Sequence, residues 1–501
     1  MKLSELVHDL SFLEKRHFSD VEIQGVTSHS GEVKQGSIFV AIVGTKVDGH
    51  LFIEKALQNG AAALVVEREI PSAKKIPVFK VENSRAALSS LAAAWYGHPS
   101  AELPVVGVTG TNGKTTITYL LGHIFKSAGK NPGVLGTIGC RFNDRQLPAA
   151  HTTPESTEIQ RLFREMRLGG VDVVAMEVSS HSVDMRRVDD VRFDVAAFTN
   201  LTPEHLDYHK SMELYFESKK RLFQHLLPRG KGVKRAVVNA DDRYGLKLID
   251  SLHSMPVWTY SLQAQSKWDF YIREWRSDLQ SMSGVLATPQ GVAEFHSPLI
   301  GAFNLSNILA ATAAACALDI PLPTILEAVA SFTGVPGRLE RIANERGLHV
   351  FVDYAHTPDA LKNVLRALSR LNPAKIITVF GCGGDRDRAK RPIMGREVAR
   401  LSNVAILTSD NPRTEDPQKI IQEIIPGVEE GGMTLNKECF VEPDRKKAIE
   451  LAIGMAKSGE VVLIAGKGHE DYQILGTEKI HFDDREEAFK CLSVEVSECR
   501  S

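Results

Sequence analysis

A glycine-rich segment at residues 105–116, VVGVTGTNGKTT, has the residue types that bind a polyphosphate. An apolar run leads into it, and the helix-like run ITYLLGHIF follows. Glycines let backbone N–H groups curl around phosphate oxygens, and the N-terminal end of the next helix adds positive charge. Lys114 would reach the outer phosphates, and the Thr115 hydroxyl would bind Mg²⁺. We therefore expect a nucleoside triphosphate at Gly110, Thr111, Asn112, Gly113, Lys114, Thr115 and Thr116.

The loop is a variant of the usual phosphate-binding pattern. GxxxxGK[ST] requires glycine at position 108, where this chain has Val108, and the glycines stand at 107, 110 and 113. The alternative is a glycine-rich turn followed by a coincidental Lys-Thr pair. The flanking strand-like and helix-like runs favour the phosphate loop.

Two further polar residues follow apolar runs. Glu177 ends the run VDVVAM, and His205 lies in the loop after 195–199. Together with Thr115 they supply a hydroxyl oxygen, a carboxylate and one imidazole. This set of ligands suits Mg²⁺ when phosphate and water oxygens complete its coordination. Taken singly, each residue also fits a solvated loop position.

The elements that must position these residues alternate along the chain. Short β-branched runs alternate with helix-like stretches, which predicts an α/β fold with largely parallel sheets. Ligands of open α/β sheets lie beyond the carboxyl ends of the strands. Strands are expected at Ile38–Val43, Ala63–Val66, Val105–Val108, Val171–Met176, Val195–Thr199, Ala236–Asn239, Val350–Asp353, Ile376–Phe380, Val404–Thr408 and Val461–Ala465.

Length and composition set the organisation. At about 150 residues per domain, 501 residues predict roughly three domains. Gly/Pro-rich breaks at 95–104 and 331–338 divide the chain into domains at 1–97, 98–337 and 338–501. A hydrophobic fraction of 43% and a net charge of -2 exclude a disordered chain, a coiled coil and a protein that coats nucleic acid.

The expected location is the cytoplasm. The N-terminus has no signal-peptide core, and no run of about 18 apolar residues could enter a membrane. The six cysteines are scattered without a CxxC pair, as expected of reduced thiols rather than disulfides.

Several motifs resemble the Mur ligase family, ATP-dependent enzymes that form amide bonds in peptidoglycan assembly. They include GTNGKTT at 110–116, HTTPES at 151–156, MEVSSH at 176–181, TNLTPEHLDYH at 199–209, GVPGRLE at 334–340, SDNPRTEDP at 409–417 and GKGHEDYQ at 466–473. The resemblance implies a central P-loop-type parallel sheet between an N-terminal α/β uridine-nucleotide domain and a C-terminal Rossmann-like α/β domain.

The resemblance also assigns nucleotide and metal residues. It puts Glu177 and His205 at metal positions and adds ATP contacts at Asn307, Arg338 and Asp353. A lysine spaced as Lys219 is from Tyr215 carries a carbamate in the family and supports Mg²⁺. Helical periodicity does not distinguish Lys219 from Lys220, which lies on an equally apolar face. The implied catalytic residues are Lys114, Lys219 and His205.

Substrate residues follow from the same motifs. Ser28 and the loop 44–49 match positions near a UDP group. Contacts with a muramoyl-dipeptide are implied at Thr152, Thr153, Ser179 and Arg187. Met185 stands where relatives often have glutamine, and His151 where asparagine is common, so a substrate hydrogen bond differs here.

The third domain resembles the members that add diaminopimelate. The implied amino-acid contacts are Arg386, Asp410, Asn411, Pro412, Arg413, Gly466 and Glu470. Diaminopimelate has one carboxylate more than lysine, and a guanidinium can bind it bidentately. Glu470 suits the distal ammonium. The alternative for Arg413 is a surface ion pair with Glu415 or Asp416.

The implied reaction is ATP-dependent. ATP phosphorylates the D-glutamyl carboxylate of UDP-N-acetylmuramoyl-L-alanyl-D-glutamate, and the amine of meso-diaminopimelate attacks the acyl phosphate. The base is not assigned, and His356 is one unassigned histidine. Small-molecule substrates and a monomer are expected. The alternatives are a folylpolyglutamate synthetase, which would lack the uridine-type domain and the DNPR motif, and a P-loop switch ATPase.

Overall fold

The computed structural model describes residues 1–44, 47–70 and 76–493. They form two compact units, the first made of Met1–Glu274, Val285–Phe295 and Ser306–Val329, and the second of Trp275–Gly284, His296–Leu305 and the chain from Ala330 onward. Within the described ranges no helix is long and apolar enough to cross a membrane. Five cysteines are free thiols, whereas Cys499 and loop positions 45 and 46 lie outside the described residues.

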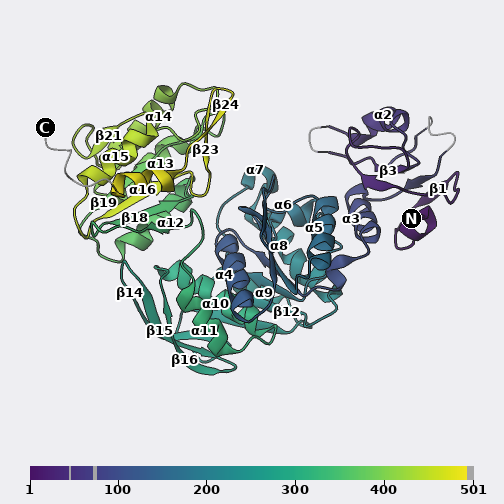
Figure 1. The fold of residues 1–501 in the computed structure, drawn as a ribbon, viewed down its shortest axis with the longest axis horizontal. Coiled ribbons are helices and arrows are strands. Elements are labelled where there is room, and N and C mark those ends of the chain that lie inside the picture. The colour runs from purple at the N-terminus through teal and green to yellow at the C-terminus, as the bar shows by residue number, and fades with distance from the viewer. Residues whose placement is uncertain (45–46, 71–75, 494–501) are drawn as a thin grey trace. The chain divides into compact units, whose positions relative to one another are not determined.

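The N-terminal part of the first unit is a five-stranded sheet in the order β1-β5-β4-β3-β2 (Figure 1). β2 to β5 run parallel and β1 pairs antiparallel with β5. Ile38 and Val40 face one apolar core and Phe39 the other, as expected of a sheet covered on both faces. The elements are α1 (Leu3–Leu6), β1 (Glu14–Arg16), β2 (Gly25–Thr27), β3 (Ser37–Val40), α2 (Ile53–Gln58), β4 (Ala63–Val66), β5 (Val78–Lys80) and α3 (Ser84–Trp95).

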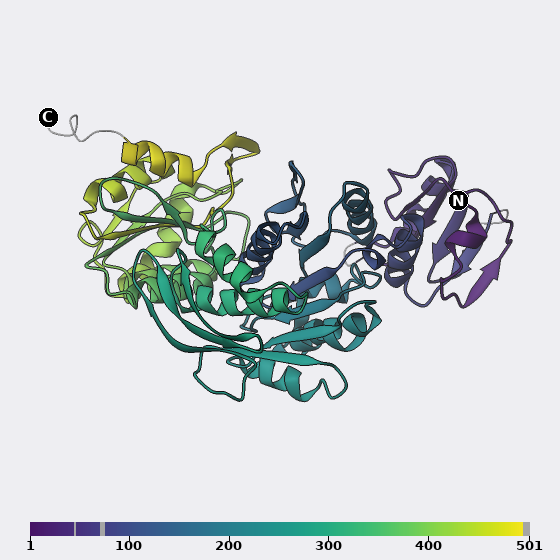
Figure 2. The same ribbon diagram turned by 60° about the horizontal axis from the view of Figure 1, so that its bottom comes forward.

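The central sheet has eleven strands in the order β16-β15-β14-β13-β12-β11-β6-β10-β7-β8-β9. The strands are β6 (Val105–Thr109), β7 (Pro132–Gly136), β8 (Gly139–Phe142), β9 (Arg145–Leu147), β10 (Val173–Glu177), β11 (Val195–Phe198), β12 (Arg235–Asn239), β13 (Val257–Ser261), β14 (Phe270–Ser277), β15 (Met282–Thr288) and β16 (Gly291–Ser297). Figure 2 shows β14 to β16 as long strands.

The central sheet is accompanied by eight helices of the described chain. They are α4 (Lys114–Ser127), α5 (Ser156–Leu168), α6 (Ser180–Asp184), α7 (Leu206–His209), α8 (Met212–Arg221), α9 (Arg243–Asp250), α10 (Ala302–Cys316) and α11 (Leu322–Ser331). β6 lies between β10 and β11 and is parallel to both. The carboxyl ends of these three strands therefore meet at one edge, which is where an open α/β sheet places its ligand.

The second unit contains a six-stranded sheet in the order β17-β18-β22-β19-β20-β21, with only β17 antiparallel to its neighbour, and a β23-β24 hairpin. The elements are β17 (Glu340–Ile342), β18 (His349–Asp353), α12 (Pro358–Ser369), β19 (Ile376–Phe380), α13 (Lys390–Leu401), β20 (Val404–Leu407), α14 (Pro417–Glu430), β21 (Cys439–Val441), α15 (Arg445–Met455), β22 (Val461–Ala465), β23 (Tyr472–Leu475), β24 (Glu478–His481) and α16 (Asp484–Ser493).

Alternation along β22 explains why this sheet has two cores. Val461, Leu463 and Ala465 pack with α12, α13 and α14, whereas Val462 and Ile464 pack with α15 and α16. All five residues are buried, and such a run is typical of a parallel strand covered on both faces. Each of the ten strands expected from the sequence overlaps a strand of the structure.

A buried ion pair joins this sheet to its last helix. Arg445 and Asp484 are both fully buried, and Nε and Nη2 of Arg445 each donate to the Asp484 carboxylate at 2.7 Å. Arg445 also donates to the carbonyl oxygens of Ser409 and Ala465. The guanidinium therefore ties together the chain segments that leave β20 and β22.

We expect Asp484→Asn to lower the free energy of unfolding by about 3–5 kcal/mol, because it leaves the Arg445 charge buried without its counter-ion. Urea denaturation of the full chain measures this change. Lys490→Ala is the matched control on the same helix, since the Lys490 ammonium is exposed and its ion pair with Glu487 should stabilise the fold much less than the buried pair. Equal losses in the two variants would contradict a stabilising role for the buried pair.

Candidate active site

The phosphate-loop segment connects the buried strand β6 to the N-terminus of α4. Gly110 and Gly113 have φ angles of +146° and +91°, which disfavour other residues. A Cβ at Gly110 would lie 1.8 Å from Oγ1 of Thr199, and one at Gly113 would lie 2.4 Å from Oδ1 of Asn307. The fold therefore brings Asn307, one of the expected ATP contacts, against the loop, and it requires both glycines.

The segment after β11 holds this loop in place. The amide nitrogens of Thr111 and Asn112 donate to the backbone oxygen and the Oδ1 of Asn200, each at 2.9 Å. Thr199 Oγ1 donates to the Asn112 carbonyl at 2.6 Å. Sequence reasoning missed the contribution of Thr199 and Asn200, although TNLT directly follows an expected strand that pairs with the loop's own strand.

Two lysines share one carbonyl oxygen. Lys114 Nζ and Lys219 Nζ both donate to the Gly110 oxygen at 2.9 Å, and Lys114 also donates to Thr111. Lys219 is only 1% exposed. Burial, with a smaller contribution from the Lys114 charge, holds the pKa of Lys219 well below its usual range. Lys220 instead pairs with Glu217 at the surface, so of the two lysines that periodicity left equivalent, Lys219 is the buried one.

Tyr215 links this lysine to the loop. Its hydroxyl lies 3.2 Å from Thr111 Oγ1, and its ring centroid lies 4.7 Å from Lys219 Nζ. The ring stacks on His209, with centroids 4.9 Å apart, and His205 packs edge-on at 6.3 Å. Burial lowers the pKa of His205. The Tyr-Lys spacing noted in the sequence thus places both side chains beside the phosphate loop.

Glu177 ends β10 and is 1% exposed. Its two carboxylate oxygens accept from the backbone N and the Oγ1 of Thr137, at 2.8 and 3.1 Å. The Thr137 hydroxyl lies 3.1 Å from that of Thr152. Both donors to Glu177 are neutral groups of one residue, and they fix the buried carboxylate at the carboxyl edge of the sheet.

The residues expected to bind the muramoyl-dipeptide continue this network. Thr153 Oγ1 donates to the Glu177 carbonyl at 2.9 Å and to Ser179 Oγ at 3.3 Å. Arg187 donates to the Thr153 carbonyl at 3.0 Å and pairs with Glu155. Its Nε is buried without a hydrogen-bond partner among the described residues. Thr152, Thr153, Ser179 and Arg187 are thus brought together around Glu177.

Two sequence differences and one more substrate residue can be placed. The sulfur of Met185 lies 3.6 Å from Arg187 Nη2, so this residue touches the expected dipeptide contact. His151 lies exposed in the segment just before Thr152. Ser28 is half-buried directly after β2, in the N-terminal sheet rather than in the network around Glu177.

Thr115, Glu177, His205 and Lys219 were expected to hold Mg²⁺. Thr115 is buried in the first turn of α4, and the buried carboxylate of Glu177 is a hard-oxygen donor that suits this ion. No group of three or more His, Cys, Asp and Glu side chains able to hold a metal occurs in the described part of the chain.

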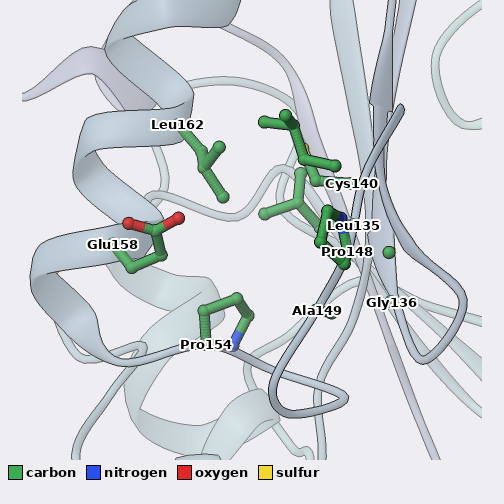
Figure 3. Close-up of a pocket in the computed structure, with 10 residues that line it drawn as sticks. Leu135, Gly136, Cys140, Pro148, Ala149, Pro154, Glu158 and Leu162 are labelled. Atoms are coloured by element: carbon green, nitrogen blue, oxygen red, sulfur yellow. The ribbon is translucent and has the colours of Figure 1, made fainter. Parts of the chain in front are cut away.

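A small pocket of about 270 Å³, part of it open to solvent, lies beside the Glu177 network. Figure 3 shows Glu158 and Leu162 of α5 facing Leu135, Cys140 and Pro148 across it. The Glu158 carboxylate is already paired with Arg161. The lining is mostly apolar, so this pocket adds no charged group to the network.

The second unit gathers its polar residues at the carboxyl ends of β18, β19, β20 and β22. Asn411, which follows β20, donates from Nδ2 to Glu470 Oε2 at 3.0 Å. Lys467, which sequence reasoning left unassigned, donates to Asn411 Oδ1 at 3.1 Å. Burial and the neighbouring Asp410 raise the pKa of Glu470. Its place in the motif GKGHE, next to Gly466 and three residues before Glu470, is the sequence feature that could have identified Lys467.

Arg413 lies in the same cluster. It has a φ of +52°, and its Nη1 donates to the Gly384 carbonyl at 2.8 Å. Nη1 also lies 3.4 Å from the backbone oxygen of Asn411, whose side chain donates to Glu470, so the guanidinium and the carboxylate contact the same residue. The alternative of a surface ion pair with Glu415 is not what the structure shows, because Glu415 binds Arg391 instead.

The remaining amino-acid residues surround this pair. Gly466 approaches Asp410 so closely that a Cβ would lie 2.9 Å from the Oδ2 atom. The carbonyl of Pro412 would lie 1.9 Å from a Cβ at Gly384, so the 383–387 loop packs tightly on the 410–413 segment. Arg386 is exposed on that loop, where it donates to the Asp385 carbonyl.

A buried arginine fixes both loops. Arg391 is fully buried and binds Glu415 through two hydrogen bonds, at 2.8 and 3.0 Å, and Glu423 at 2.7 Å. These contacts hold the pKa of Glu415 at about 2. Glu415 in turn accepts from the Asp385 amide. Sequence reasoning missed Arg391, whose only signal was its place in the RDRAKRP run.

Arg338 and Asp353, the other expected ATP residues, lie near each other in the second unit. The Asp353 carboxylate accepts from the amides of Leu339 and Ala355, at 2.7 and 2.8 Å, and burial raises its pKa. Arg338 stacks on the Tyr354 ring at 4.8 Å, and its Nε is buried without a partner in the described chain. His356, the unassigned histidine, donates from Nδ1 to the Tyr354 carbonyl.

Comparison with known proteins places these features in one family. Three family models match the chain: "Mur ligase family, catalytic domain" over 22–96, "Mur ligase middle domain" over 108–315 and "Mur ligase, glutamate ligase domain" over 337–468.

Curated relatives match over nearly the full length. Proteins named UDP-N-acetylmuramoyl-L-alanyl-D-glutamate–2,6-diaminopimelate ligase are similar in Geobacter sulfurreducens (49% identity, 97% of this chain and 98% of the relative), Gloeobacter violaceus (44%, 98% and 98%) and Geobacillus thermodenitrificans (43%, 97% and 98%).

Solved structures agree. One of a ligase with that same name is 33% identical, with a TM-score of 0.73 over 98% of each chain. The MurF ligase of Thermotoga maritima in complex with ADP shares the fold, at 21% identity and a TM-score of 0.60 over 95% of this chain and 98% of that chain. From these matches and the three-domain α/β architecture, the chain belongs to the Mur ligase family.

Proposed function

We propose that this protein is an ATP-dependent ligase that joins meso-diaminopimelate to the D-glutamate of UDP-N-acetylmuramoyl-L-alanyl-D-glutamate in cytoplasmic peptidoglycan precursor synthesis. The observation that carries the proposal is that Arg413 and Glu470 both bind Asn411: Arg413 Nη1 donates to its backbone oxygen at 3.4 Å, and Glu470 Oε2 accepts from its Nδ2 at 3.0 Å. A cation and an anion held on one residue match the distal carboxylate and ammonium of diaminopimelate. Relatives named for this reaction are 42–49% identical to the chain.

The proposed reaction activates a carboxylate. The D-glutamyl carboxylate attacks the γ-phosphorus of ATP, ADP leaves, and an acyl phosphate forms. The amine of diaminopimelate then attacks the acyl carbon, loses a proton, and expels inorganic phosphate as the amide forms. Lys114 is held at the loop by the carbonyls of Gly110 and Thr111, from where its ammonium can move to the phosphates.

We assign the ligands domain by domain. Residues 1–97 with Ser28 bind the uridine nucleotide, 98–337 bind ATP and the dipeptide, and 338–501 bind the amino acid. Thr152, Thr153, Ser179 and Arg187 would hold the dipeptide, because their network ends in the Nε of Arg187, which is buried without a hydrogen-bond partner among the described residues. The assignment of Arg338 and Asp353 to ATP remains a prediction. We further propose a monomer.

Mg²⁺ suits the ligand atoms that the proposed site offers. Thr115, Glu177, His205 and a carbamate on Lys219 would hold it, and when bound it would neutralise phosphate charge. The carbamate forms when the neutral Lys219 amine adds to the carbon of CO₂ and releases a proton. Burial favours the neutral amine, which this addition requires.

Substrate dependence tests the overall proposal. We expect phosphate release from ATP only when both the UDP-muramoyl-dipeptide and an amino acid are present. Because lysine would leave Arg413 unpaired, kcat/KM for meso-diaminopimelate should exceed that for L-lysine by about 100-fold or more. Release without either substrate would favour a switch ATPase, and equal use of the two amino acids would contradict the assigned specificity.

Lys219→Ala should lose most ligase activity and recover part of it when a short-chain carboxylic acid such as acetate is added, since the acid replaces the carbamate oxygens. Initial rates with and without acetate measure this. Lys220→Ala is the matched control, because its side chain pairs at the surface and should leave the rate unchanged. Full activity of Lys219→Ala would refute the carbamate.

Arg413→Ala should raise KM for diaminopimelate by about 10- to 100-fold, the cost of a lost hydrogen bond between charged groups, while KM for ATP changes little. Steady-state kinetics with each substrate varied in turn give both constants. Arg400→Ala removes an exposed arginine at the end of α13 and serves as the control. An unchanged ratio of the two KM values would remove Arg413 from the amino-acid site.

A further inference from the structure

Lys467 is an unusual feature of the amino-acid site, because its side chain is fully buried. Its Nζ donates to Asn411 Oδ1 at 3.1 Å and lies 3.7 Å from Glu470 Oε2 and 3.9 Å from Asp410 Oδ1. A buried ammonium is costly unless it is paired, and here two carboxylates and an amide oxygen surround it. The proposed reaction uses none of these lysine contacts directly.

The Asn411 side chain forms hydrogen bonds with both Lys467 and Glu470 and so connects the two residues. Its Oδ1 accepts from Lys467 Nζ and from the backbone N of Ile474, at 3.1 and 3.0 Å. Two donors at one end of the amide fix its orientation, because the reversed amide would set its NH₂ group against both of them. Nδ2 is thereby directed at Glu470 Oε2, 3.0 Å away.

We propose that Lys467 is a positioning residue for amine binding, which fixes the Asn411 amide and through it the Glu470 carboxylate that receives the distal ammonium of diaminopimelate. The inference rests on the proposed function and adds a residue to it. Lys467 itself has no part in contacting the amino acid. Its ammonium also lies within 4 Å of both the Glu470 and the Asp410 carboxylates.

The pKa of Glu470 distinguishes this role from a purely structural one, because a purely structural role of Lys467 would not change that pKa. Burial and Asp410 raise the pKa of Glu470, whereas Lys467 and the Asn411 hydrogen bond lower it. Loss of Lys467 should therefore raise the pKa of Glu470 further, so that the carboxylate becomes protonated at a higher pH. The charged and titratable groups that face Glu470 are Asp410, Arg413, Arg445, Lys467, Tyr354 and Tyr472.

The test is Lys467→Met in the full chain. We expect KM for meso-diaminopimelate to rise about tenfold or more, the effect of losing a charged hydrogen bond, with kcat at saturation within about threefold of wild type. KM for ATP and for the UDP-muramoyl-dipeptide should not change. The increase in KM on acidification should begin about one pH unit higher than in wild type. Lys467→Arg, which keeps the charge and a donor, should restore most of the affinity.

Lys457→Met is the matched control, because it removes an exposed lysine from the segment that precedes β22. If Lys467→Met does not fold, Asn411→Leu is the second variant. It removes the hydrogen bonds that link Lys467 to Glu470 while Lys467 itself remains. The pH at which its KM begins to rise should then also move upward.

A wild-type KM and pH profile in Lys467→Met, or a wild-type pH profile in Asn411→Leu, would overturn the inference. These outcomes are distinct from failure of the proposed function, in which the wild-type protein itself would not use diaminopimelate.

Discussion

The parallel pairing of β6 with β10 and β11 is the constraint on which the active-site geometry depends. Because the three strands share a direction, the phosphate loop, Glu177 and the segment from Thr199 emerge at one edge. Thr199 and Asn200 then form hydrogen bonds with the phosphate loop, and Asn307 packs against Gly113. Antiparallel pairing of any one of these strands would send its polar end to the opposite edge.

The sequence predicted this arrangement well where local signals were strong. The apolar run before Gly110 identified β6, and runs ending in Glu177 and Thr199 identified the neighbouring strands. The order of the strands could not be read from the chain, because β6 and β10 are separated by α4, the three strands β7 to β9, and α5. Strand pairing that distant depends on tertiary packing rather than on local propensity.

Buried charges were the hardest residues to predict. Lys219 and Lys220 are adjacent and lie on equally apolar helical faces, so only the packing beside Gly110 distinguishes them. Arg391 and Arg445 stand in runs of basic residues that look exposed, and Lys467 stands in a glycine-rich segment, yet all three are fully buried. Their partners Glu415, Asp484 and Asn411 lie 24, 39 and 56 residues away in the sequence, and only folding brings each pair together.

The Arg391 contacts described above separate the frame of the amino-acid site from its recognition groups. The side chains of Glu415, Glu423 and Arg391 bind one another, and Glu415 also accepts from the Asp385 amide on the 383–387 loop. The loops therefore keep their shape independently of which side chain is displayed at position 386. A scaffold of this kind is modular: natural divergence or protein engineering can change the amine that is accepted by exchanging displayed residues, without rebuilding the core beneath them.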